Sequence, residues 1–451
     1  MFKRILIANR GEIALRIIRT CRRMGIETVV VHSTADAESL PVRMADAAIC
    51  IGPPQAGQSY LNIQNIIAAA ELADVDAIHP GYGFLAENSH FAQVVRDCKI
   101  EFIGPTSHSM DALGNKAKAK ALAVEAGVPT VPGSAGPVAN QDEAIAVARK
   151  IGYPVMIKAV AGGGGRGMRV AHNEASLVSG LIQATREAEA AFGNGACIIE
   201  ALIQRARHIE IQVIADNHGN VISLGERDCS TQRRHQKLIE ESPSPVITPE
   251  QRTAMGADAV KLARAAGYTN AGTVEFIYDL DRKQYFFLEM NTRIQVEHPV
   301  TEMVTDLDLI RLQIEVAAGL PLGFKQSDVV WRGHAIEARI NAEDWEHNFA
   351  PFPGKITMYV APSGKGVRVD SHCFAGYTIP PNYDSMIAKL IVHGKDREEA
   401  LRLMQLALDD YIIEGPKTTI GFHQRLMRDA RFVNSLVHTK FIDDEFLKRE
   451  H

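Results

Sequence analysis

Three polar residues at alternate positions, Glu289, Asn291 and Arg293, are the first candidates for chemistry in this chain. They follow Tyr285–Leu288, a run of aromatic and aliphatic residues typical of a buried strand. Because side chains alternate between the two faces of a strand, we expect the three to share one face. Carboxylate and amide oxygens suit Mg²⁺, and a guanidinium suits a planar anion. The row therefore predicts a metal site that continues into an anion site, and a solvated strand face with a Glu–Arg ion pair is the alternative.

A second carboxylate, Glu275, lies between apolar residues on the preceding predicted strand. We expect that strand, 272–278, to form a hairpin with 284–290. Such pairing brings Glu275 near Glu289, and two neighbouring carboxylates repel each other unless a cation lies between them. Taken alone, each glutamate fits a solvent-facing position of a strand. Together with Asn291, the two carboxylates predict a metal site.

A run of four glycines, 162–165, is the strongest local signal in the sequence. Glycine adopts dihedral angles that other residues avoid and presents backbone N–H groups to phosphate oxygens. No Lys-Ser or Lys-Thr follows the run, so it is not a Walker A loop, and a flexible surface hairpin is the alternative. Lys158 precedes the run inside an apolar strand and needs a charged partner, for which a nucleotide phosphate is a candidate. A lysine that reaches solvent from the edge of a sheet is the other interpretation.

The segment after the predicted strand offers an anion cradle and a base. Arg293, Gln295 and the backbone N–H of Val296 form a set suited to a small carboxylate-like anion. Glu297 is a candidate general base if its pKa is tuned. We interpret His298, which precedes a proline, as a structural loop histidine.

Alternating strands and helices over residues 1–113 predict a doubly wound, mostly parallel sheet. The loop 79–88 follows a strand end, at the carboxyl edge where ligands of such folds bind. A Pro/Gly-rich stretch, 128–137, indicates a domain boundary. Residues 226–237 form a dense polar run, whose basic part, 233–237, is by itself typical of a solvated face. We expect helices at 12–24, 63–72, about 111–126, 144–151, 177–192, 249–266, 307–318, 397–408 and 418–427, and strands at 5–8, 28–32, 77–79, 102–104, 153–160, 168–171, 196–200, 207–215, 221–224, 272–278, 284–290, 333–340, 355–360 and 366–370.

The composition limits the class of protein. The chain has 451 residues, 46% of them hydrophobic and 23% charged, as in an ordinary globular enzyme of about three domains. The net charge of −5 gives no reason to expect nucleic acid or a membrane surface as a partner, and no apolar run is long enough to span a bilayer. Six cysteines without a Cys-x-x-Cys pair, and a first segment that is interrupted by charge, predict a cytoplasmic enzyme without disulfides or structural zinc.

These signals combine into a recognisable pattern. Lys158, the glycine run ending in Arg166-Gly167, Glu275 and Glu289-Met-Asn291 together resemble the ATP-grasp fold. Further strings are similar to the biotin carboxylase family, namely IANRGEIA at 7–14, HPGYGFL at 79–85, ERDCS at 226–230, QRRHQK at 232–237, EMNTRIQVEHPVTE at 289–302 and RINAED at 339–344. The likeness runs from residue 1 to about residue 445.

The resemblance implies a chain of several domains of the α/β and α+β classes. An N-terminal doubly wound parallel sheet, similar to a Rossmann fold, would occupy residues 1–129. An ATP-grasp lid with the glycine-rich loop would occupy 130–203. The ATP-grasp core and the C-terminal biotin carboxylase domain would share 204–451, with the C-terminal part beginning at about 330.

The resemblance also implies a reaction. The enzyme would use ATP and Mg²⁺ or Mn²⁺, with two ions bound, to activate bicarbonate as carboxyphosphate, and would then carboxylate a ring nitrogen of biotin held on a carrier protein. The implied contacts with ATP are Lys116, Lys158, Gly164, Gly165, Glu200, Ala201, Leu202, Ile203, His208, Gln232 and His235. The implied metal ligands are Glu275, Glu289 and Asn291, and the implied bicarbonate ligands are Lys237, Arg293, Gln295 and Val296. Glu297 would deprotonate bicarbonate, and Arg339 would stabilise the enolate of biotin.

The expected partners follow from what the sequence lacks. It contains no Ala-Met-Lys-Met biotin attachment sequence and no carboxyltransferase region, so we expect the biotin carboxyl carrier protein and the carboxyltransferase subunits to act in trans. The chain thus resembles the free-standing subunit of a bacterial-type acetyl-CoA carboxylase, which supplies malonyl-CoA for fatty acid synthesis. Such subunits pair as homodimers, and the resemblance places Arg16 and Arg368 at the dimer surface.

Three alternatives stay open. The subunit of a split pyruvate or other acyl-CoA carboxylase would carry the same motifs, because the final acceptor is chosen by other subunits. A different ATP-grasp ligase, joining a carboxylate to an amine, would share Lys158, the glycine loop and the metal set but would have no use for the segment 293–297 or for Arg339. A nucleotide-sensing module without catalysis is the third, and the intact base and metal set argues against it.

Overall fold

The computed structural model describes residues 1–160, 168–192 and 194–448. Their contacts divide the chain into two compact units. We call Met1–Val128, Arg207–Ile277 and Glu289–His451 the core unit, and Pro129–Ala206 with Tyr278–Leu288 the small unit.

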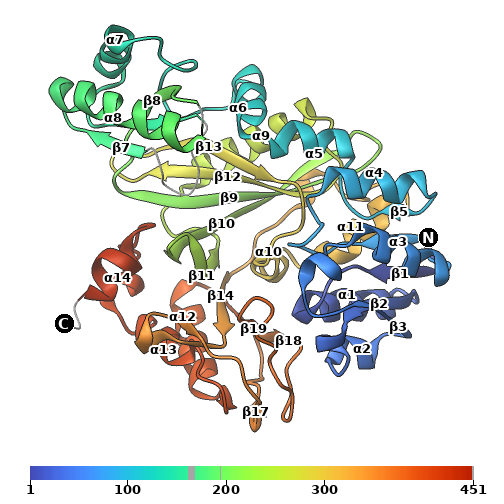
Figure 1. Ribbon diagram of the computed structural model, residues 1–451. Coiled ribbons are helices and arrows are strands. Elements are labelled where there is room, and N and C mark those ends of the chain that lie inside the picture. Colours follow the sequence, from blue (N-terminus) through green and yellow to red (C-terminus); the bar gives the residue numbers. More distant parts are fainter. Residues whose placement is uncertain (161–167, 193, 449–451) are drawn as a thin grey trace. The chain divides into compact units, whose positions relative to one another are not determined.

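The N-terminal part of the core unit is a parallel five-stranded sheet with the order β3-β2-β1-β4-β5 (Figure 1). Its strands are β1 Arg4–Ile7, β2 Glu27–Ser33, β3 Ala47–Gly52, β4 Ala77–His79 and β5 Glu101–Phe102. Its helices are α1 Gly11–Arg23, α2 Leu40–Met44, α3 Ile63–Leu72, α4 Ser89–Asp97 and α5 Ser107–Gly114. Strands β2 and β3 lie on one side of β1, and β4 and β5, which follow them in sequence, lie on the other, which confirms the predicted doubly wound sheet.

The alternation of side chains along β1 explains why both faces of this sheet are covered. Ile5 and Ile7 pack into one hydrophobic cluster together with apolar residues of α1, whereas Leu6 packs into a second cluster on the other face. The order of strands reverses between β1 and β4, and the loop after β4 lies beside the end of β1. Asn9 fixes that loop, because its Nδ2 donates to the carbonyl oxygens of Pro80 at 2.7 Å and Tyr82 at 2.8 Å.

The centre of the structure is an eight-stranded sheet with the order β13-β12-β9-β10-β11-β14-β19-β18. Its strands are β9 Ala206–Ala215, β10 Val221–Arg233, β11 Gln236–Ser242, β12 Asn270–Asp279, β13 Gln284–Asn291, β14 His334–Asn341, β18 Val367–Ser371 and β19 Met386–Gly394. The helices α9 Pro249–Ala265 and α10 His298–Thr305 pack against β10, and α11 Leu309–Ala317 follows them in sequence.

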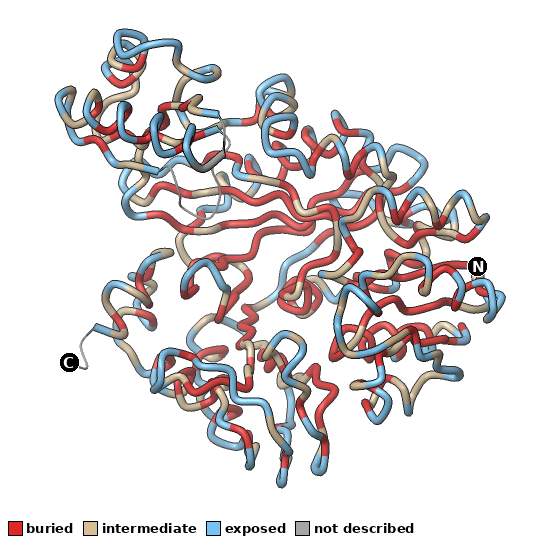
Figure 2. Tube along the Cα trace, viewed as in Figure 1, coloured by how far each residue is buried: buried red, intermediate tan, exposed pale blue. Residues whose placement is uncertain are grey.

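Strand β10 corrects part of the interpretation of the basic run 233–237 as a solvated face, because Arg233 is buried in β10 and Lys237 is half-buried in β11, whereas Arg234 and His235 are exposed. Every residue of β10 is buried, although most of its second half is polar or charged (Figure 2). The strand lies between β9 and β11, and two helices pack against it, so its charged side chains find partners inside the protein rather than in solvent. The strands β11 and β19 were not predicted, since both carry charges at positions that the structure buries.

The helix predicted at about 111–126 is two helices. Helix α5 ends at Gly114, and α6 begins at Lys116 and ends at Glu125. Asn115 between them is extended, and its side-chain oxygen accepts the N–H groups of Ala117 and Lys118, which starts the second helix. Lys116 therefore lies in the first turn of a helix and not in the middle of one.

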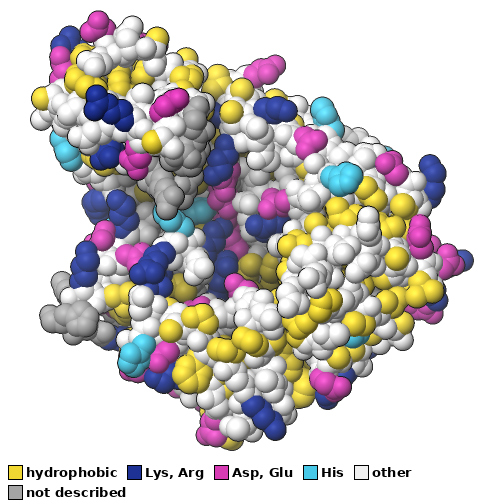
Figure 3. All heavy atoms as spheres, viewed as in Figure 1, with side chains coloured by type: hydrophobic (Ala, Val, Ile, Leu, Met, Phe, Trp, Pro, Cys, Tyr) yellow, Lys and Arg dark blue, Asp and Glu magenta, His cyan; other side chains and the backbone are white. Residues whose placement is uncertain are grey.

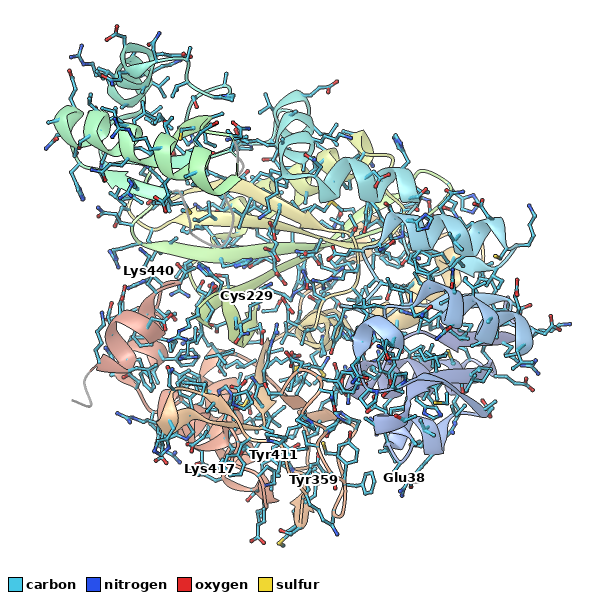
Figure 4. The ribbon with its side chains drawn as sticks, viewed as in Figure 1. Glu38, Cys229, Tyr359, Tyr411, Lys417 and Lys440 are labelled. Atoms are coloured by element: carbon cyan, nitrogen blue, oxygen red, sulfur yellow. The ribbon has the colours of Figure 1, made fainter. Side chains whose placement is uncertain are left out.

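The C-terminal part of the core unit has its own hydrophobic cluster, in which Phe422 packs its ring 5.2 Å from that of Phe349 and 5.5 Å from that of Phe446. Tyr359 and Tyr411 lie close together beside a pair of short strands, with 2.8 Å between their hydroxyl oxygens (Figure 4). The remaining elements are β15 Glu343–Asp344, β16 Ala350–Pro351, β17 Met358–Val360, α12 Arg397–Asp409, β20 Ile412–Glu414, α13 Ile420–Leu426 and α14 Ala430–Val433.

The small unit is an antiparallel sheet with two helices. The strands have the order β7-β6-β8, and their bounds are β6 Val155–Ala159, β7 Met168–Ala171 and β8 Cys197–Ala201. The helices are α7 Gln141–Ile151 and α8 Glu174–Phe192. Alternate residues of β6 are buried, which follows from the period of two along a strand packed on one face.

The surface shows acidic and basic side chains interspersed over the face visible in Figure 3. A search of the described residues finds no helix with the length and apolarity that a bilayer crossing requires.

Candidate active site

Lys237, on β11, is the centre of a cluster of charges in the core unit. Its Nζ donates to Glu210 Oε2 at 2.6 Å, to Glu297 Oε1 at 2.6 Å and to Glu275 Oε1 at 3.2 Å. The three carboxylates come from β9, from the residue before α10 and from β12. Along β9, Glu210 alternates with the apolar Ile209 and Ile211, so its side chain leaves the strand on the opposite face, where it meets the lysine.

Arg339, on β14, contacts the carboxylate of Glu297 from another side. Its Nη2 donates to Glu297 Oε2 at 2.9 Å, and its Nε donates to Glu240 Oε1 at 2.6 Å. The two oxygens of Glu297 are thus held by two different cations, and the exposed fraction of its side chain is only 1%. Lys237 and Arg339, which belong to two separate sequence motifs, therefore meet at the carboxylate of Glu297, which belongs to a third.

The charges of this cluster set the protonation of its members. Burial acts to raise the pKa of Glu297, but Lys237, Arg339 and Arg227 outweigh it and hold that pKa well below its usual range. Burial acts to lower the pKa of Lys237, and the surrounding acidic groups raise it well above its usual value. Burial raises the pKa of Glu240 to about 7, against the opposing effect of Arg339. Glu297 is therefore ionised at neutral pH and able to accept a proton.

Two buried residues of β10 support the cluster and were not among the predicted site residues. Arg227 is fully buried and donates to Glu210, to Gln212 Oε1 at 2.7 Å and to Thr301 Oγ1 at 3.0 Å. The Cys229 thiol, labelled in Figure 4, lies 3.8 Å from Glu297 Oε1. The string at 226–230 contributes to the family resemblance, but only the contacts with Glu210 and Glu297 show that these side chains face the site.

The predicted metal ligands lie at the edge of the cluster. Asn291 Nδ2 donates to Glu275 Oε1 at 2.7 Å, so these two predicted ligands are in contact. Glu289 Oε2 instead pairs with Lys116 Nζ at 3.1 Å. His208 Nε2 lies 3.0 Å from Glu275 Oε2, and lysine and histidine together lower the pKa of that glutamate to about 2 in spite of its burial. The donor set of two carboxylates and an amide fits a hard cation.

The predicted bicarbonate ligands lie next to these predicted metal ligands. Arg293 Nη1 donates to Gln295 Oε1 at 2.7 Å, and Arg293 Nε donates to Glu87 Oε2 at 2.9 Å. Gln295 Nε2 is 3.5 Å from Glu275 Oε1, which connects this part to the Lys237 cluster. The carbonyl oxygen of Val296 accepts a hydrogen bond of 2.8 Å from Lys389 Nζ, a residue that the sequence did not single out.

His298 corrects an interpretation from the sequence. It is fully buried at the first position of α10 rather than in a loop, and its Nδ1 is 2.8 Å from the carbonyl oxygen of Gln295. Burial and the nearby Lys389 hold the pKa of His298 well below its usual value, so the ring is neutral.

Two of the predicted nucleotide contacts lie on the strands β10 and β11 and the turn between them. Gln232 is buried, and its Nε2 donates to the carbonyl oxygen of Cys229 at 3.3 Å. His235 is exposed in the turn, with a φ of 66°. Its side chain is thus free of the core and open to a ligand.

The small unit carries the other predicted nucleotide contacts. Lys158 Nζ donates to Glu200 Oε2 at 2.6 Å, so two residues assigned to ATP pair with each other. The backbone N–H groups of Ala201 and Leu202 donate to carbonyl oxygens within the unit, and Ile203 is half-buried. Gly164 and Gly165 lie outside the described residues.

Three family models match consecutive parts of the chain. The N-terminal domain of biotin carboxylase matches residues 1–110, the ATP binding domain of the carbamoyl-phosphate synthase L chain matches 115–325, and the C-terminal domain of biotin carboxylase matches 337–444. The chain belongs to the biotin carboxylase family. The members of this family are ATP-dependent ligases, and the chain is an enzyme of that class.

Named relatives span the whole length of the chain. Biotin carboxylase 1 of Bacillus subtilis is 57% identical over 98% of both chains. One of the subunits of pyruvate carboxylase from Methanothermobacter thermautotrophicus is 54% identical over 98% of this chain and 90% of that one. A biotin carboxylase from Campylobacter jejuni, solved as a complex described as β-γ-ATP, shares 50% identity over 98% of this chain and 99% of that chain, with a TM-score of 0.89. These similarities confirm the ATP-grasp architecture of biotin carboxylase.

Proposed function

We propose that this biotin carboxylase uses ATP to activate bicarbonate and transfers the carboxyl group to biotin on a separate carrier protein. The observation that carries the proposal is the position of Glu297, with its two oxygens 2.6 Å from Lys237 Nζ and 2.9 Å from Arg339 Nη2. A buried carboxylate between two cations is a base beside two groups that bind oxyanions.

Bicarbonate binds, in this proposal, to Lys237, Arg293, Gln295 and the backbone of Val296. Lys237 and Arg293 supply positive charge, and the amide of Gln295 supplies a neutral donor next to Arg293. An arriving anion competes with Glu297 for Lys237. As the lysine turns to the anion, it stabilises the ionised glutamate less, so the basicity of Glu297 rises when its substrate is present.

Glu297 then takes the proton of bicarbonate, and the resulting carbonate oxygen attacks the γ-phosphate of ATP to give carboxyphosphate and ADP. The carboxyl group then passes from carboxyphosphate to the ring nitrogen of biotin, while inorganic phosphate leaves and takes the proton of that nitrogen. Arg339 faces the same base, and we assign it to the enolate oxygen of biotin, where negative charge develops when the ring nitrogen loses its proton. The same active site thus serves bicarbonate and the biotin enolate, because Glu297 lies between Lys237 and Arg339.

The oxygen donors of Glu275, Glu289 and Asn291 fit the Mg²⁺ or Mn²⁺ ions that accompany ATP, two of them in this proposal. Such a cation would neutralise charge on the phosphates of the nucleotide. For ATP itself we assign Lys116, Lys158, Glu200, Ala201, Leu202, Ile203, His208, Gln232 and His235 as contacts, with the part 130–203 as a lid that excludes water from a labile intermediate. The solved 2-oxoglutarate carboxylase domain of Hydrogenobacter thermophilus, 47% identical with a TM-score of 0.88 over 100% of this chain and 99% of that one, is described in complex with MgADP, ADP and bicarbonate.

We propose that the final acceptor is acetyl-CoA, with the carrier and carboxyltransferase subunits acting in trans in the cytoplasm. Relatives named simply biotin carboxylase, from Bacillus subtilis and a Nostoc species, support a free-standing subunit. All six cysteines are free thiols, which suits a reducing compartment. Pyruvate is a second candidate acceptor, because the matched pyruvate carboxylase chain is 54% identical.

We also propose a homodimer through the surface that contains Arg16 and Arg368. Both arginines pair with Glu302, and Arg16 pairs with Asp308 as well. They line a hollow of about 650 Å³ together with Arg19, Arg22, Arg23 and acidic residues. The Hydrogenobacter domain named above is described as a dimer.

The proposal is tested by ADP release from purified protein with MgATP, with and without bicarbonate and with free biotin added. We expect release that requires bicarbonate and rises with biotin. Release that ignores both, but appears with another carboxylate and an amine, would assign the chain to a different ATP-grasp ligase. To identify the acceptor, carrier and carboxyltransferase subunits of an acetyl-CoA carboxylase and of a pyruvate carboxylase are added in turn. Malonyl-CoA formation with the first set supports our proposal, and oxaloacetate formation only with the second set refutes it.

A further inference from the structure

The segment Thr292–Glu297 has no regular secondary structure, although it carries the predicted anion ligands and the base. It lies between the end of β13 and the first residue of α10. A loop that must hold Arg293, Gln295 and Glu297 in one arrangement needs restraints from outside, because its own backbone forms neither a helix nor a sheet.

The first restraint comes from Glu87, which stands in the loop after β4. Its Oε1 accepts the backbone N–H of Thr292 at 2.9 Å, and its Oε2 accepts Arg293 Nε at 2.9 Å. One carboxylate therefore fixes both the backbone at the start of the segment and the guanidinium that follows. Because Nε donates to Glu87 and Nη1 donates to Gln295 Oε1, the nitrogen of Arg293 left to face an anion is Nη2, which is 3.5 Å from Asn291 Oδ1.

Glu87 is itself held firmly. It directly precedes Asn88, whose side chain caps α4 by accepting the N–H of Phe91. The loop before it turns sharply at Phe84, which has a φ of 38° and stacks its ring 5.0 Å from that of Tyr60. The motif at 79–88 thus has a use that the proposed mechanism does not assign, since it places a carboxylate beside the anion-binding segment.

The second restraint comes from Lys389 on β19. Its side chain is fully buried, and its Nζ donates to the carbonyl oxygen of Val296 at 2.8 Å while pairing with Glu12 Oε1 at 3.2 Å. Burying an ammonium group costs free energy unless it is paired and hydrogen-bonded, and here Glu12 supplies the charge partner and the Val296 carbonyl oxygen supplies the hydrogen bond. The Val296 carbonyl shares a planar peptide with the N–H of Glu297. A carbonyl held by a cation therefore fixes the direction of that N–H, which points away from Lys389, and polarises it as a donor.

We infer that Glu87 and Lys389 are positioning residues for bicarbonate, which hold the segment Thr292–Glu297 from two sides so that Arg293 and the backbone of Val296 keep the arrangement that binds the anion. This inference rests on the proposed function, because it concerns the same substrate. Glu87 acts through Arg293, and Lys389 acts through the peptide between Val296 and Glu297. Glu12 in α1 supports Lys389, which links the motif at 7–14 to the same task.

The test compares Glu87→Gln and Lys389→Met with wild type and with Glu27→Gln as a control. Glu27 is a matched choice, because it is an exposed carboxylate that also pairs with an arginine, Arg4, at 2.7 Å in the N-terminal sheet. The measurement is the KM for bicarbonate and the KM for ATP in bicarbonate-dependent ADP release. We expect Glu87→Gln and Lys389→Met to raise the KM for bicarbonate about tenfold, the effect of losing one charge-assisted hydrogen bond, with the KM for ATP changed less than about twofold.

Wild-type protein is assayed first, so that the two proposals fail separately. Wild-type ADP release that ignores bicarbonate refutes the proposed function. Bicarbonate-dependent release in wild type, with an unchanged bicarbonate KM in Glu87→Gln, refutes the positioning role. A lower bicarbonate KM in Glu87→Gln also refutes it, because that result would make Glu87 a competitor for Arg293. Thermal unfolding shows whether Lys389→Met folds, and if it does not, Glu87→Gln decides alone, since the side chain of Glu87 is 41% exposed and its substitution spares the core.

Discussion

Lys237 and Glu297 form a buried ion pair with 2.6 Å between Nζ and Oε1, and Arg339 holds the other oxygen of the same carboxylate at 2.9 Å. The pair joins a cation suited to an oxyanion with the base that would deprotonate it. Its two members come from β11 and from the turn before α10, which are far apart in the sequence.

Glu297→Gln should abolish turnover while MgATP still binds. The amide keeps the shape of the side chain but accepts a proton far less readily, so we expect ADP release to fall by about 10²- to 10⁴-fold. Nucleotide affinity, measured by calorimetry, should change little because the carboxylate contacts Lys237 and Arg339 rather than the predicted nucleotide ligands. Full turnover in this variant would exclude Glu297 as the base. Glu27→Gln serves as the matched control.

Arg339→Ala should impair carboxylation of free biotin far more than binding of ATP. The guanidinium faces Glu297 and Glu240, and its removal takes away the group assigned to the biotin enolate. We expect carboxybiotin formation to fall by about 10²-fold or more, the usual size for loss of one oxyanion donor. The control is Arg4→Ala, which removes a half-exposed arginine of the N-terminal sheet. Biotin carboxylation at the wild-type rate would remove Arg339 from the mechanism.

Glu241 should make the protein sensitive to acid. Arg397 Nε donates to its Oε2 at 2.7 Å, and His334 Nε2 is 2.9 Å from the same oxygen. Burial acts to raise the pKa of Glu241, but these partners lower it to about 2. Because the folded pKa is below the unfolded value near 4.3, the stabilisation is complete above about pH 4.3 and disappears as the pH falls toward 2, with a total of about 3 kcal/mol.

The variant Glu241→Gln isolates this contribution. Its Tm should be lower than that of wild type at pH 6, and the difference should shrink as the pH is lowered to 3. Thermal unfolding followed at pH 6, 5, 4 and 3 measures it. A difference that stays constant over this range would show that the ion pairs of Glu241 do not stabilise the fold.

Cys229 and Cys50 should react differently with iodoacetamide. Burial, with nearby acidic groups, raises the pKa of Cys229 well above its usual value, so its thiol stays protonated next to Glu297. Cys50 is exposed. We expect mass spectrometry to find Cys50 alkylated at pH 7.5 and Cys229 alkylated only after unfolding in urea. Rapid labelling of Cys229 in the native protein would contradict the burial of β10, and Cys50→Ser provides the control for total labelling.

Local chemistry was enough for the N-terminal sheet and for the candidate residues within 275–297, whereas the roles of Lys237 and Arg339 came only from the family resemblance. The alternation of strands and helices in the first part predicted a parallel doubly wound sheet, and β9 lies where a strand was expected at 207–215. The motif at 289–302 is one of several strings that carried the family resemblance, and the alternation of Glu289, Asn291 and Arg293 could be interpreted from neighbouring residues alone.

Which charges meet depends on how distant segments of the chain pack together. Arg227, Cys229 and Lys389 were not among the predicted site residues, yet all three are buried, and the two cations pair with Glu210 on β9 and with Glu12 in α1. Likewise, Asn115 divides one predicted helix into two through a cap that propensity alone does not reveal. The local alternation of polar and apolar residues can be predicted from the chain alone, because it depends on short-range sterics and hydrophobicity. The arrangement of Lys237, Glu297 and Arg339 depends on strand pairing between distant segments, and that is fixed only when the chain folds.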